Sequence, residues 1–455
     1  MSAITPEPHE AAFAHLREVD AREGGLPVER REALLLALDR GLVARADAFV
    51  AALDEDFGGR SAEETLLAEC LSVANAIRHA RRGLRRWAKP RRVGVDLPFW
   101  PTRAWVVPQP LGVVGVMSPW NYPVHLSLSP LVGAVAAGNR VMLKPAEGTP
   151  RAAAALAGLL DEALGADVAR VVHGGPEIAA AFARLPFDHL LFTGSSERGR
   201  EVMRAAAENL TPVTLELGGK CPAVVLPDAD LDRAARAIVL GKALNAGQTC
   251  VAPDTVLLAG GLEAGPVRDA LRRAYAEAYP GGRLPTAMIS ARHAARMEGL
   301  SAGAALEPLG PDHALSLAVE PGAGSPLLRE EVFGPVLPIV RVADLAAATA
   351  WIRARAAPLA VYLFTRDRRA EAEVLASTRA GALVVNGTVV QAAVEALPFG
   401  GVGASGFGRY HGRAGFDTFS NLRAHVRAAP FNLARLCDPP YGARKMGLIR
   451  RLLRG

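Results

Sequence analysis

A thiol and a carboxyl group each lie beside glycines in this 455-residue chain. Cys250 ends the stretch LNAGQTC at residues 244–250, and Glu216 stands in LELGG at residues 215–219. A covalent acyl-enzyme mechanism needs such a pair, because sulfur attacks a carbonyl carbon and a carboxylate later activates water. Either residue alone is more often structural. Together they predict a nucleophile, Cys250, and a general base, Glu216, both on tight turns.

A proline-flanked segment supplies a candidate donor to an oxyanion. Asn121 lies between two aromatic residues in SPWNYP at residues 118–123. Such a loop is rigid, so the amide N–H groups of Asn121 can be preorganised toward developing negative charge. The alternative is an asparagine that only forms a turn, which is the commoner role for a single Asn.

A third segment has the character of a phosphate site. Gly194 and Ser195 join a predicted strand to a predicted helix, where a small-residue turn exposes backbone N–H groups and the positive helix end to a phosphate. The segment lacks the first glycine of G-x-G-x-x-G. An ordinary strand–helix turn capped by Ser195 or Ser196 is therefore the alternative.

A cation and a carboxylate follow the predicted strand at 140–143. Lys144 and Glu147 are spaced to hold the two hydroxyl groups of an adenosine ribose, and a carboxylate there would repel a 2′-phosphate. This favours NAD over NADP, with NADP left open, and a surface Lys–Glu pair is the alternative. The segments 330–335 and 398–406 combine acid, aromatic and glycine residues, but nothing local decides whether they bind a ligand.

The elements that must position these residues alternate along the chain. Apolar residues recur at helical spacing over 29–57 and 62–87, with Ser61 as an N-cap of the second helix. Residues 90–110 are predicted to be extended, as a strand of a small sheet outside the main core. From residue 111 the predicted strands are 112–117, 140–143, 168–172 and 190–192, and the predicted helices between them are 126–137, 149–163, 177–185 and 196–209. This alternation predicts an α/β fold with a parallel sheet that binds nucleotides at the C-terminal ends of its strands.

The rest of the chain continues the same pattern. A second α/β series is expected from residue 223 to about 386. The tail, 416–455, is predicted to begin as a strand and to end in a basic segment, 444–454.

Composition limits the class of protein. Half of the residues are apolar, which is enough for two large domains. The formal charge of +6 suggests nucleic acid, but the Arg residues are scattered among acids, so no nucleic-acid partner is expected. The four cysteines lie far apart without the spacing of a zinc site or a disulfide framework, which predicts no metal and a reducing compartment. With no signal peptide or spanning segment in the sequence, a cytoplasmic enzyme is expected.

Seven ordered motifs resemble the aldehyde dehydrogenase superfamily over roughly residues 15 to 425. They are PWNYP at 119–123, KPAE at 144–147, TGS at 193–195, ELGGK at 216–220, GQTC at 247–250, EVFGP at 331–335 and PFGG at 398–401. Finer features, including LLAE at 66–69 and YHGRAGFDTFS at 410–420, are similar to the class 3 branch and, within it, to the coniferyl aldehyde dehydrogenases.

The resemblance implies a role for each motif. Cys250 would be the nucleophile and Glu216 the general base, with Asn121 and the Cys250 backbone N–H as the oxyanion hole. The implied cofactor-binding residues are Lys144 and Glu147 at the adenosine ribose, Gly194 and Ser195 near the diphosphate, Glu331 at the nicotinamide ribose and Phe333 against the nicotinamide, with Gly218 also in the cofactor site.

The implied architecture is a Rossmann-like cofactor domain, an α/β catalytic domain and a small bridging sheet. The corresponding ranges are 1–97 with 111–218 for the NAD-binding domain, 219–396 for the catalytic domain, and 98–110 with 412–455 for the oligomerisation segment and tail. The implied reaction is NAD(P)-dependent oxidation of an aldehyde, aromatic or medium-chain aliphatic, by a homodimer.

Three alternatives accompany this interpretation. The thioester could pass to coenzyme A instead of water, although Glu216 argues for hydrolysis. The chain could be a catalytically silent binding protein on the same fold. The basic segment 444–454 could lie on an anionic membrane surface, or it could pack as a helix on its own subunit or a partner. The sequence also departs from the family at Cys221, where Ser is common, and in a shorter region at 280–329.

Overall fold

A six-stranded sheet forms the first half of the molecule, in the order β15-β7-β6-β3-β4-β5. All neighbouring strands are parallel except the short edge strand β15, which is antiparallel to β7. The strands are β3 (Val113–Met117), β4 (Arg140–Lys144), β5 (Ala169–Val171), β6 (His189–Gly194), β7 (Val213–Leu217) and β15 (Gly406–Phe407). The connecting helices are α6 (Pro123–Ala137), α7 (Pro150–Ala163), α8 (Pro176–Ala183) and α9 (Ser196–Ala207). The alternation predicted from residue 111 is confirmed.

A seven-stranded sheet forms the second half, in the order β10-β11-β12-β9-β8-β13-β14. Its strands are parallel except β10. They are β8 (Pro222–Val225), β9 (Thr255–Leu258), β10 (Leu306–Pro308), β11 (Ser316–Val319), β12 (Val336–Arg341), β13 (Ala360–Phe364) and β14 (Ala382–Val385). The accompanying helices are α10 (Leu231–Ala243), α11 (Ala264–Ala278), α12 (Ala291–Ser301), α13 (Pro326–Arg329), α14 (Leu345–Arg353) and α15 (Arg368–Ser377), with short 3₁₀ turns η3 (Leu244–Gly247), η4 (Val390–Ala392) and η5 (Gly403–Ser405).

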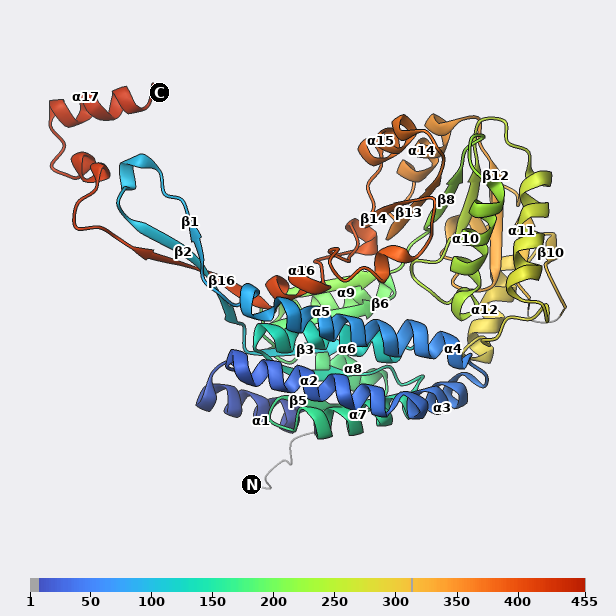
Figure 1. The fold of residues 1–455 in the computed structure, drawn as a ribbon, viewed down its shortest axis with the longest axis horizontal. Coiled ribbons are helices and arrows are strands. Elements are labelled where there is room, and N and C mark those ends of the chain that lie inside the picture. Colours follow the sequence, from blue (N-terminus) through green and yellow to red (C-terminus); the bar gives the residue numbers. More distant parts are fainter. Residues whose placement is uncertain (1–7, 312–313, 455) are drawn as a thin grey trace.

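A layer of N-terminal helices covers the six-stranded half (Figure 1). It comprises α1 (Pro8–Glu23), α2 (Val28–Ala44), α3 (Ala46–Phe57), α4 (Ala62–Glu64), the π-helical η1 (Thr65–Leu71) and α5 (Ser72–Trp87). The predicted helix at 29–57 is divided at Arg45, and the one at 62–87 contains the π turn. Ser61 caps α4 by accepting a hydrogen bond from Glu64 N–H at 3.0 Å, as predicted.

A three-stranded antiparallel sheet, β1-β2-β16, projects away from both halves (Figure 1). It is built from β1 (Arg91–Val93), β2 (Arg103–Pro110) and β16 (Ser420–Arg427), with η2 (Leu97–Phe99), η6 (Leu433–Cys437) and α17 (Ala443–Leu452) toward its outer end. The predicted extended segment at 90–110 is confirmed. Two boundaries differ: β1 pairs with β2 although 1–97 was assigned to the cofactor domain, and the tail begins with helix α16 (Gly412–Thr418) before β16.

The computed structural model describes residues 8–311 and 314–454. Within these ranges no helix has both the length and the apolar character needed to cross a membrane. The central strands β3, β4, β8, β9 and β13 are buried along their whole length, because helices cover both faces of a parallel sheet. The fold class predicted from the sequence is confirmed.

Candidate active site

Segments that follow neighbouring parallel strands meet at one edge of the six-stranded sheet. Asn121 comes after β3, Lys144 ends β4, Ser195 comes after β6 and Gly218 comes after β7. Met117 pairs with Lys144 across the sheet, so the ends of these strands lie level. Because parallel strands share one C-terminal edge, the fold brings these four predicted site residues to the same side of the sheet.

Glu216 lies inside β7, so the tight turn predicted for it is wrong. Its neighbours Leu215 and Leu217 pack in the apolar core on one face of the sheet, and strand alternation therefore turns Glu216 to the opposite face. The side chain is buried, and among the described residues neither carboxyl oxygen has a hydrogen-bond partner. Gly400 leaves room for this group, since a Cβ there would come within 2.8 Å of Oε1.

The electrostatics of Glu216 suit a general base. Burial raises the pKa of the Glu216 carboxyl well above its usual range, and the charge of Arg409 partly offsets this effect. A base works best when its pKa lies near the working pH, and burial is the usual means of raising a carboxyl pKa to that range.

The loop that leads to Cys250 has an unusual backbone. Asn245 and Ala246 both have φ of 52°, in the left-handed region that L-residues rarely occupy, and Gly247 follows with φ of 75°. A Cβ on Gly247 would lie 2.3 Å from the carbonyl oxygen of Gly334, so only glycine fits this close approach. Such conformations cost about 1–3 kcal/mol each and persist only where surrounding contacts hold them.

Gln248 supplies those contacts. Its side-chain amide donates to the carbonyl oxygens of Asn245 and Ala287 at 3.0 Å each, and its Oε1 accepts from Ile289 N–H at 3.0 Å. The side chain is fully buried. The two residues before Cys250 are therefore part of a fixed hydrogen-bonded turn.

Asn121 is bound directly to this turn. Its Nδ2 donates to the Gln248 carbonyl oxygen at 3.0 Å, and its own carbonyl oxygen accepts from Asn245 Nδ2 at 2.9 Å. The next residues along each segment also meet, through the hydroxyl groups of Tyr122 and Thr249 at 2.7 Å. The structure thus brings the predicted oxyanion donor and the predicted nucleophile together across the two halves of the molecule.

Cys250 is partly buried. Burial, together with the nearby carboxyl groups of Glu331 and Glu216, raises the pKa of its thiol to about 12. Cys221 lies close by: its thiol donates to the Cys250 carbonyl oxygen at 3.4 Å and accepts from Ala360 N–H at 3.3 Å. The thiol that departs from the family pattern therefore contacts the backbone of the predicted nucleophile.

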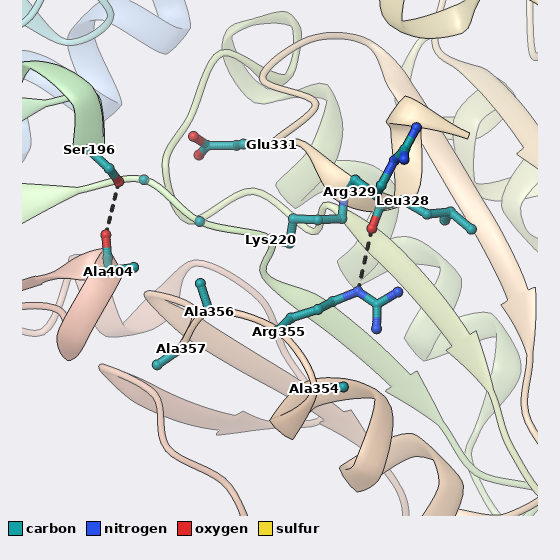
Figure 2. Close-up of a pocket in the computed structure, with 12 residues that line it drawn as sticks. Ser196, Lys220, Leu328, Arg329, Glu331, Ala354, Arg355, Ala356, Ala357 and Ala404 are labelled. Carbon is teal, nitrogen blue, oxygen red and sulfur yellow. Dashed lines mark hydrogen bonds between the residues drawn. The ribbon is translucent and has the colours of Figure 1, made fainter. Parts of the chain in front are cut away.

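A cavity of about 540 Å³ lies between the two halves. Its lining includes Ser196, Gly218, Lys220, Glu331, Arg355 and Ala404. In Figure 2 the Ser196–Ala404 hydrogen bond lies on one side and the Leu328–Arg355 hydrogen bond on the other, and the Glu331 carboxyl group projects between them.

Glu331 occupies the space that Gly218 leaves open. A Cβ on Gly218 would come within 2.1 Å of the Glu331 carboxyl group. Burial and the charge of Asp254 raise the pKa of Glu331 to about 7, although the Gly219 N–H donates to the carboxylate and favours its charged form. The motifs at 216–220 and 331–335 are therefore in direct contact.

A buried ion pair holds the segment that carries Glu331. Lys220 Nζ pairs with the Asp254 carboxylate and donates to the carbonyl oxygens of Leu327 and Glu330 at 2.7 and 2.9 Å. The second carboxylate oxygen of Asp254 accepts from Val332 N–H at 2.7 Å. One Lys–Asp pair thus fixes the backbone on both sides of Glu331.

Phe333 lies against the segment that carries Asn121. It has φ of 47°, and its ring meets the Trp120 ring edge to face at a centroid distance of 5.6 Å. His293 packs on Trp120 from another direction at 4.6 Å. This aromatic cluster links the predicted nicotinamide residue to the predicted oxyanion loop.

The residues predicted at the adenosine ribose and the adjoining phosphate turn, Lys144, Glu147, Gly194 and Ser195, lie at the sheet edge but outside the lining of that cavity. Lys144 is buried with its amine donating to the Pro145 carbonyl oxygen at 2.8 Å, while Glu147 is exposed. Burial lowers the pKa of Lys144. Ser195 caps α9 by accepting from Arg198 N–H at 3.3 Å, and Gly194 ends β6. The capping role considered as the alternative for Ser195 is thus present.

The sequence did not indicate a second buried ion pair beneath Asn121. The side chains of Arg60 and Glu69 are both fully buried, at 3.0 Å from one another. Arg60 Nη1 donates to the Asn121 carbonyl oxygen at 3.0 Å, and Glu69 accepts from His125 N–H at 2.7 Å in the first turn of α6. More than 50 residues separate the partners of each of these two hydrogen bonds in sequence, so no local pattern could reveal them.

No cluster of three or more potential metal ligands occurs within the part of the chain that the structure describes.

Comparison with known proteins places the chain in a family. The sequence pattern described as "Aldehyde dehydrogenase family" matches residues 1–425. The chain belongs to the aldehyde dehydrogenase family.

Individual relatives agree with this assignment. A "Probable coniferyl aldehyde dehydrogenase" of Pseudomonas aeruginosa is 43% identical over 97% of this chain and 96% of its own length. "Aldehyde dehydrogenase family 3 member B1" of Bos taurus is 38% identical over 93% and 92%. The solved structure "Substrate bound state of Staphylococcus Aureus AldH" superposes with a TM-score of 0.93 at 33% identity, covering 98% of this chain and all of that one. This aldehyde dehydrogenase is therefore an oxidoreductase that oxidises an aldehyde with NAD or NADP.

Proposed function

We propose that the enzyme converts its aldehyde to the carboxylic acid through a thioester at Cys250. The hydrogen bond between Asn121 Nδ2 and the Gln248 carbonyl oxygen carries this proposal, because it joins the donor loop to the nucleophile turn. The side-chain amide of Asn121 has two N–H groups. One donates to Gln248, so the other can donate to an oxyanion. The Cys250 backbone N–H is the second proposed donor.

The chain's own residues account for the remaining steps. The Cys250 thiol loses its proton to solvent and its sulfur adds to the carbonyl carbon, while the two donors stabilise the oxygen as it becomes negative. NAD or NADP, when bound, would supply the hydride acceptor for this oxidation, and Cys250 would then hold the acyl group as a thioester. Glu216 then takes a proton from water as the water attacks, which releases the acid and the Cys250 thiol.

The cavity between the two halves fits the nicotinamide end of a dinucleotide. It lies at the C-terminal edge of a parallel sheet, and Gly218 admits the Glu331 carboxyl group, an acceptor for ribose hydroxyls. Lys144 and Glu147 are proposed at the adenosine ribose, Gly194 and Ser195 at the diphosphate, and Phe333 at the nicotinamide ring. The exposed Glu147 carboxylate favours NAD over NADP, because it would repel a 2′-phosphate.

The substrate is proposed to be an aromatic propenal, in line with the coniferyl aldehyde dehydrogenases among the relatives. Medium-chain aliphatic aldehydes are the second candidate. NADH formation across both aldehyde series distinguishes them, and Cys250→Ala should abolish activity toward every aldehyde while NAD binding persists. Loss of both activity and NAD binding, or unchanged turnover in the variant, would refute the role of Cys250.

Water is proposed as the acyl acceptor, because Glu216 is buried beside the catalytic segments with both oxygens unpartnered among the described residues. An assay with and without coenzyme A tests the alternative. Acid formation that is independent of coenzyme A is expected, whereas strict dependence on coenzyme A would identify an acylating enzyme.

A homodimer is proposed through the projecting sheet. β16 is an edge strand, and seven of its eight residues are exposed. Unpaired edges of this length recruit a further strand or a covering surface. Light scattering on the purified protein should give twice the mass of one chain.

The location is proposed to be cytoplasmic, since the described cysteines Cys70, Cys221 and Cys250 are free.

A further inference from the structure

The turn before helix α4 connects the N-terminal helical layer to the second half of the molecule. The Gly59 carbonyl oxygen accepts from Ala287 N–H at 2.8 Å. Ser61 N–H donates to the Thr286 hydroxyl oxygen at 3.2 Å, and this hydroxyl group donates to the Glu64 carboxylate at 2.7 Å. A direct hydrogen bond therefore joins Glu64 to a loop between α11 and α12.

The turn that leads to Cys250 binds the same carboxylate oxygen. Glu64 Oε2, which accepts from Thr286, also accepts from Asn245 N–H at 3.1 Å. Asn245 has φ of 52°, in a left-handed region that persists only where surrounding contacts hold it. The hydrogen bond to Glu64 is one of these contacts, and its acceptor lies in the N-terminal helical layer rather than in the half that carries Cys250.

The same N-terminal segment also binds the loop of the other proposed oxyanion donor. Arg60 Nη1 donates to the Asn121 carbonyl oxygen at 3.0 Å, and this oxygen also accepts from Asn245 Nδ2 at 2.9 Å. The Arg60 side chain is fully buried, which restricts its movement. Residues 60–64 thus contact the Asn121 loop and the Cys250 turn at the same time.

We propose that Glu64 is a positioning residue for the oxyanion hole, a role that rests on the function proposed above for Asn121 and Cys250. Donors stabilise an oxyanion only when they lie at about 2.7–3.1 Å from it. A misplacement of about 1 Å caused by a change far from the chemistry can lower a rate on the order of 100-fold. Because the two donors come from different halves of the molecule, a segment that contacts both of them fixes their separation.

The rate of acylation in Glu64 variants tests this role. Glu64→Met keeps the length of the side chain but removes the acceptor for Asn245 N–H. Stopped-flow measurement should show NADH formation in the first turnover slowed by about 10- to 100-fold, while NAD titration gives an unchanged Kd and so shows an intact fold. Glu64→Gln retains a carbonyl oxygen as acceptor and should restore most of the rate. A Glu64→Gln protein as slow as Glu64→Met would contradict the positioning role.

A double-mutant cycle separates positioning from a general loss of structure. Residues that act on one geometry have non-additive effects. Glu64→Met should therefore slow acylation much less in a protein that already carries Asn121→Ala, since one of the two donors is then absent. The same fold-loss in both backgrounds would overturn the proposal.

Glu63 supplies the matched control. It is the adjacent acid, it is exposed, and its carboxylate accepts from the Ser61 hydroxyl group at 2.8 Å within its own segment. Glu63→Met should leave NADH formation unaltered, and a Glu64→Met protein as fast as this control would refute the role of Glu64. Normal turnover in Cys250→Ala or Asn121→Ala would instead refute the proposed function, so the two failures are distinguishable.

Discussion

The two large sheets present opposite edges to the active site. The six-stranded sheet contributes residues at or just after the ends of β3, β4, β6 and β7, whereas the seven-stranded sheet contributes residues that come before its strands. Cys221 precedes β8, Cys250 and Asp254 precede β9, and Glu331 precedes β12. Nucleotide-binding sheets hold their ligands at the C-terminal ends of their strands. The residues from the six-stranded sheet follow this rule, whereas those from the seven-stranded sheet lie at the N-terminal ends of its strands.

This difference has a structural consequence. Residues at the C-terminal edge are placed by the strands themselves, as Glu216 is within β7. Residues at the N-terminal edge of the second sheet lie on loops, and other contacts must hold them: left-handed backbone at Asn245 and Phe333, and the buried Lys220–Asp254 pair. We expect the site residues of the seven-stranded sheet to depend more on contacts with segments distant in sequence than the site residues of the six-stranded sheet do.

The largest effect is expected from breaking the anchor at Lys220. Lys220→Met leaves the Asp254 carboxylate buried without its cation, which should lower the free energy of unfolding by about 3–5 kcal/mol. Chemical denaturation measures this change. Since Lys220 also holds the carbonyl groups of Leu327 and Glu330, affinity for NAD should fall as well.

An exposed ion pair is the matched control. Arg273 and Asp232 lie 2.8 Å apart with more than 60% of each side chain exposed. Arg273→Met should change the free energy of unfolding by less than about 1 kcal/mol. Equal losses for the two variants would show that Lys220 is not an anchor.

The second effect concerns Asn121, which lies at the C-terminal edge but is bound to the loop of the opposite sheet. Asn121→Ala should lower kcat by about 10²–10³-fold, because one oxyanion donor is lost. Affinity for NAD should change little. Stopped-flow measurement of NADH formation should show that the acylation step is slowed; a variant that changes only KM would contradict the role.

The smallest effect is a shift in pH dependence. Arg409→Gln removes the cation that lowers the pKa of Glu216, so this pKa should rise further and the base should ionise at higher pH. The rising limb of the kcat profile for thioester hydrolysis should move to higher pH, with turnover at pH 7 lower by roughly two- to tenfold. A shift to lower pH would contradict the assignment of Glu216 as base.

Much of the first half of the site was predictable from local pattern. The strand–helix alternation from residue 111 indicated the parallel sheet, and its C-terminal edge indicated Lys144 and Ser195. Glu216 was singled out through its glycines, and its strand was missed although residues 213–217 alternate apolar and polar side chains, as a half-buried strand does. Asn121 was singled out from its rigid segment, and the structure shows a buried, hydrogen-bonded side chain; its role as an oxyanion donor stays a prediction.

The rest of the site depends on contacts between distant segments. Cys250 was identifiable from its motif, yet nothing in the sequence showed that Gln248 and Asn245 join it to Asn121. The Arg60–Glu69 pair gave no local signal, because each residue acts on a segment more than 50 positions away. Hydrogen bonds between segments that are distant in sequence leave no periodic pattern from which they could be predicted.

The central claim is that Cys250 holds the acyl group until Glu216 delivers water. Mass spectrometry of Glu216→Gln after mixing with aldehyde and NAD tests it most directly. We expect a burst of NADH and a protein heavier by one acyl group, mapped to Cys250, with no adduct on Cys221 or in Cys250→Ala. A Glu216→Gln protein that turns over at the normal rate without any adduct, or an adduct on another residue, would contradict the account.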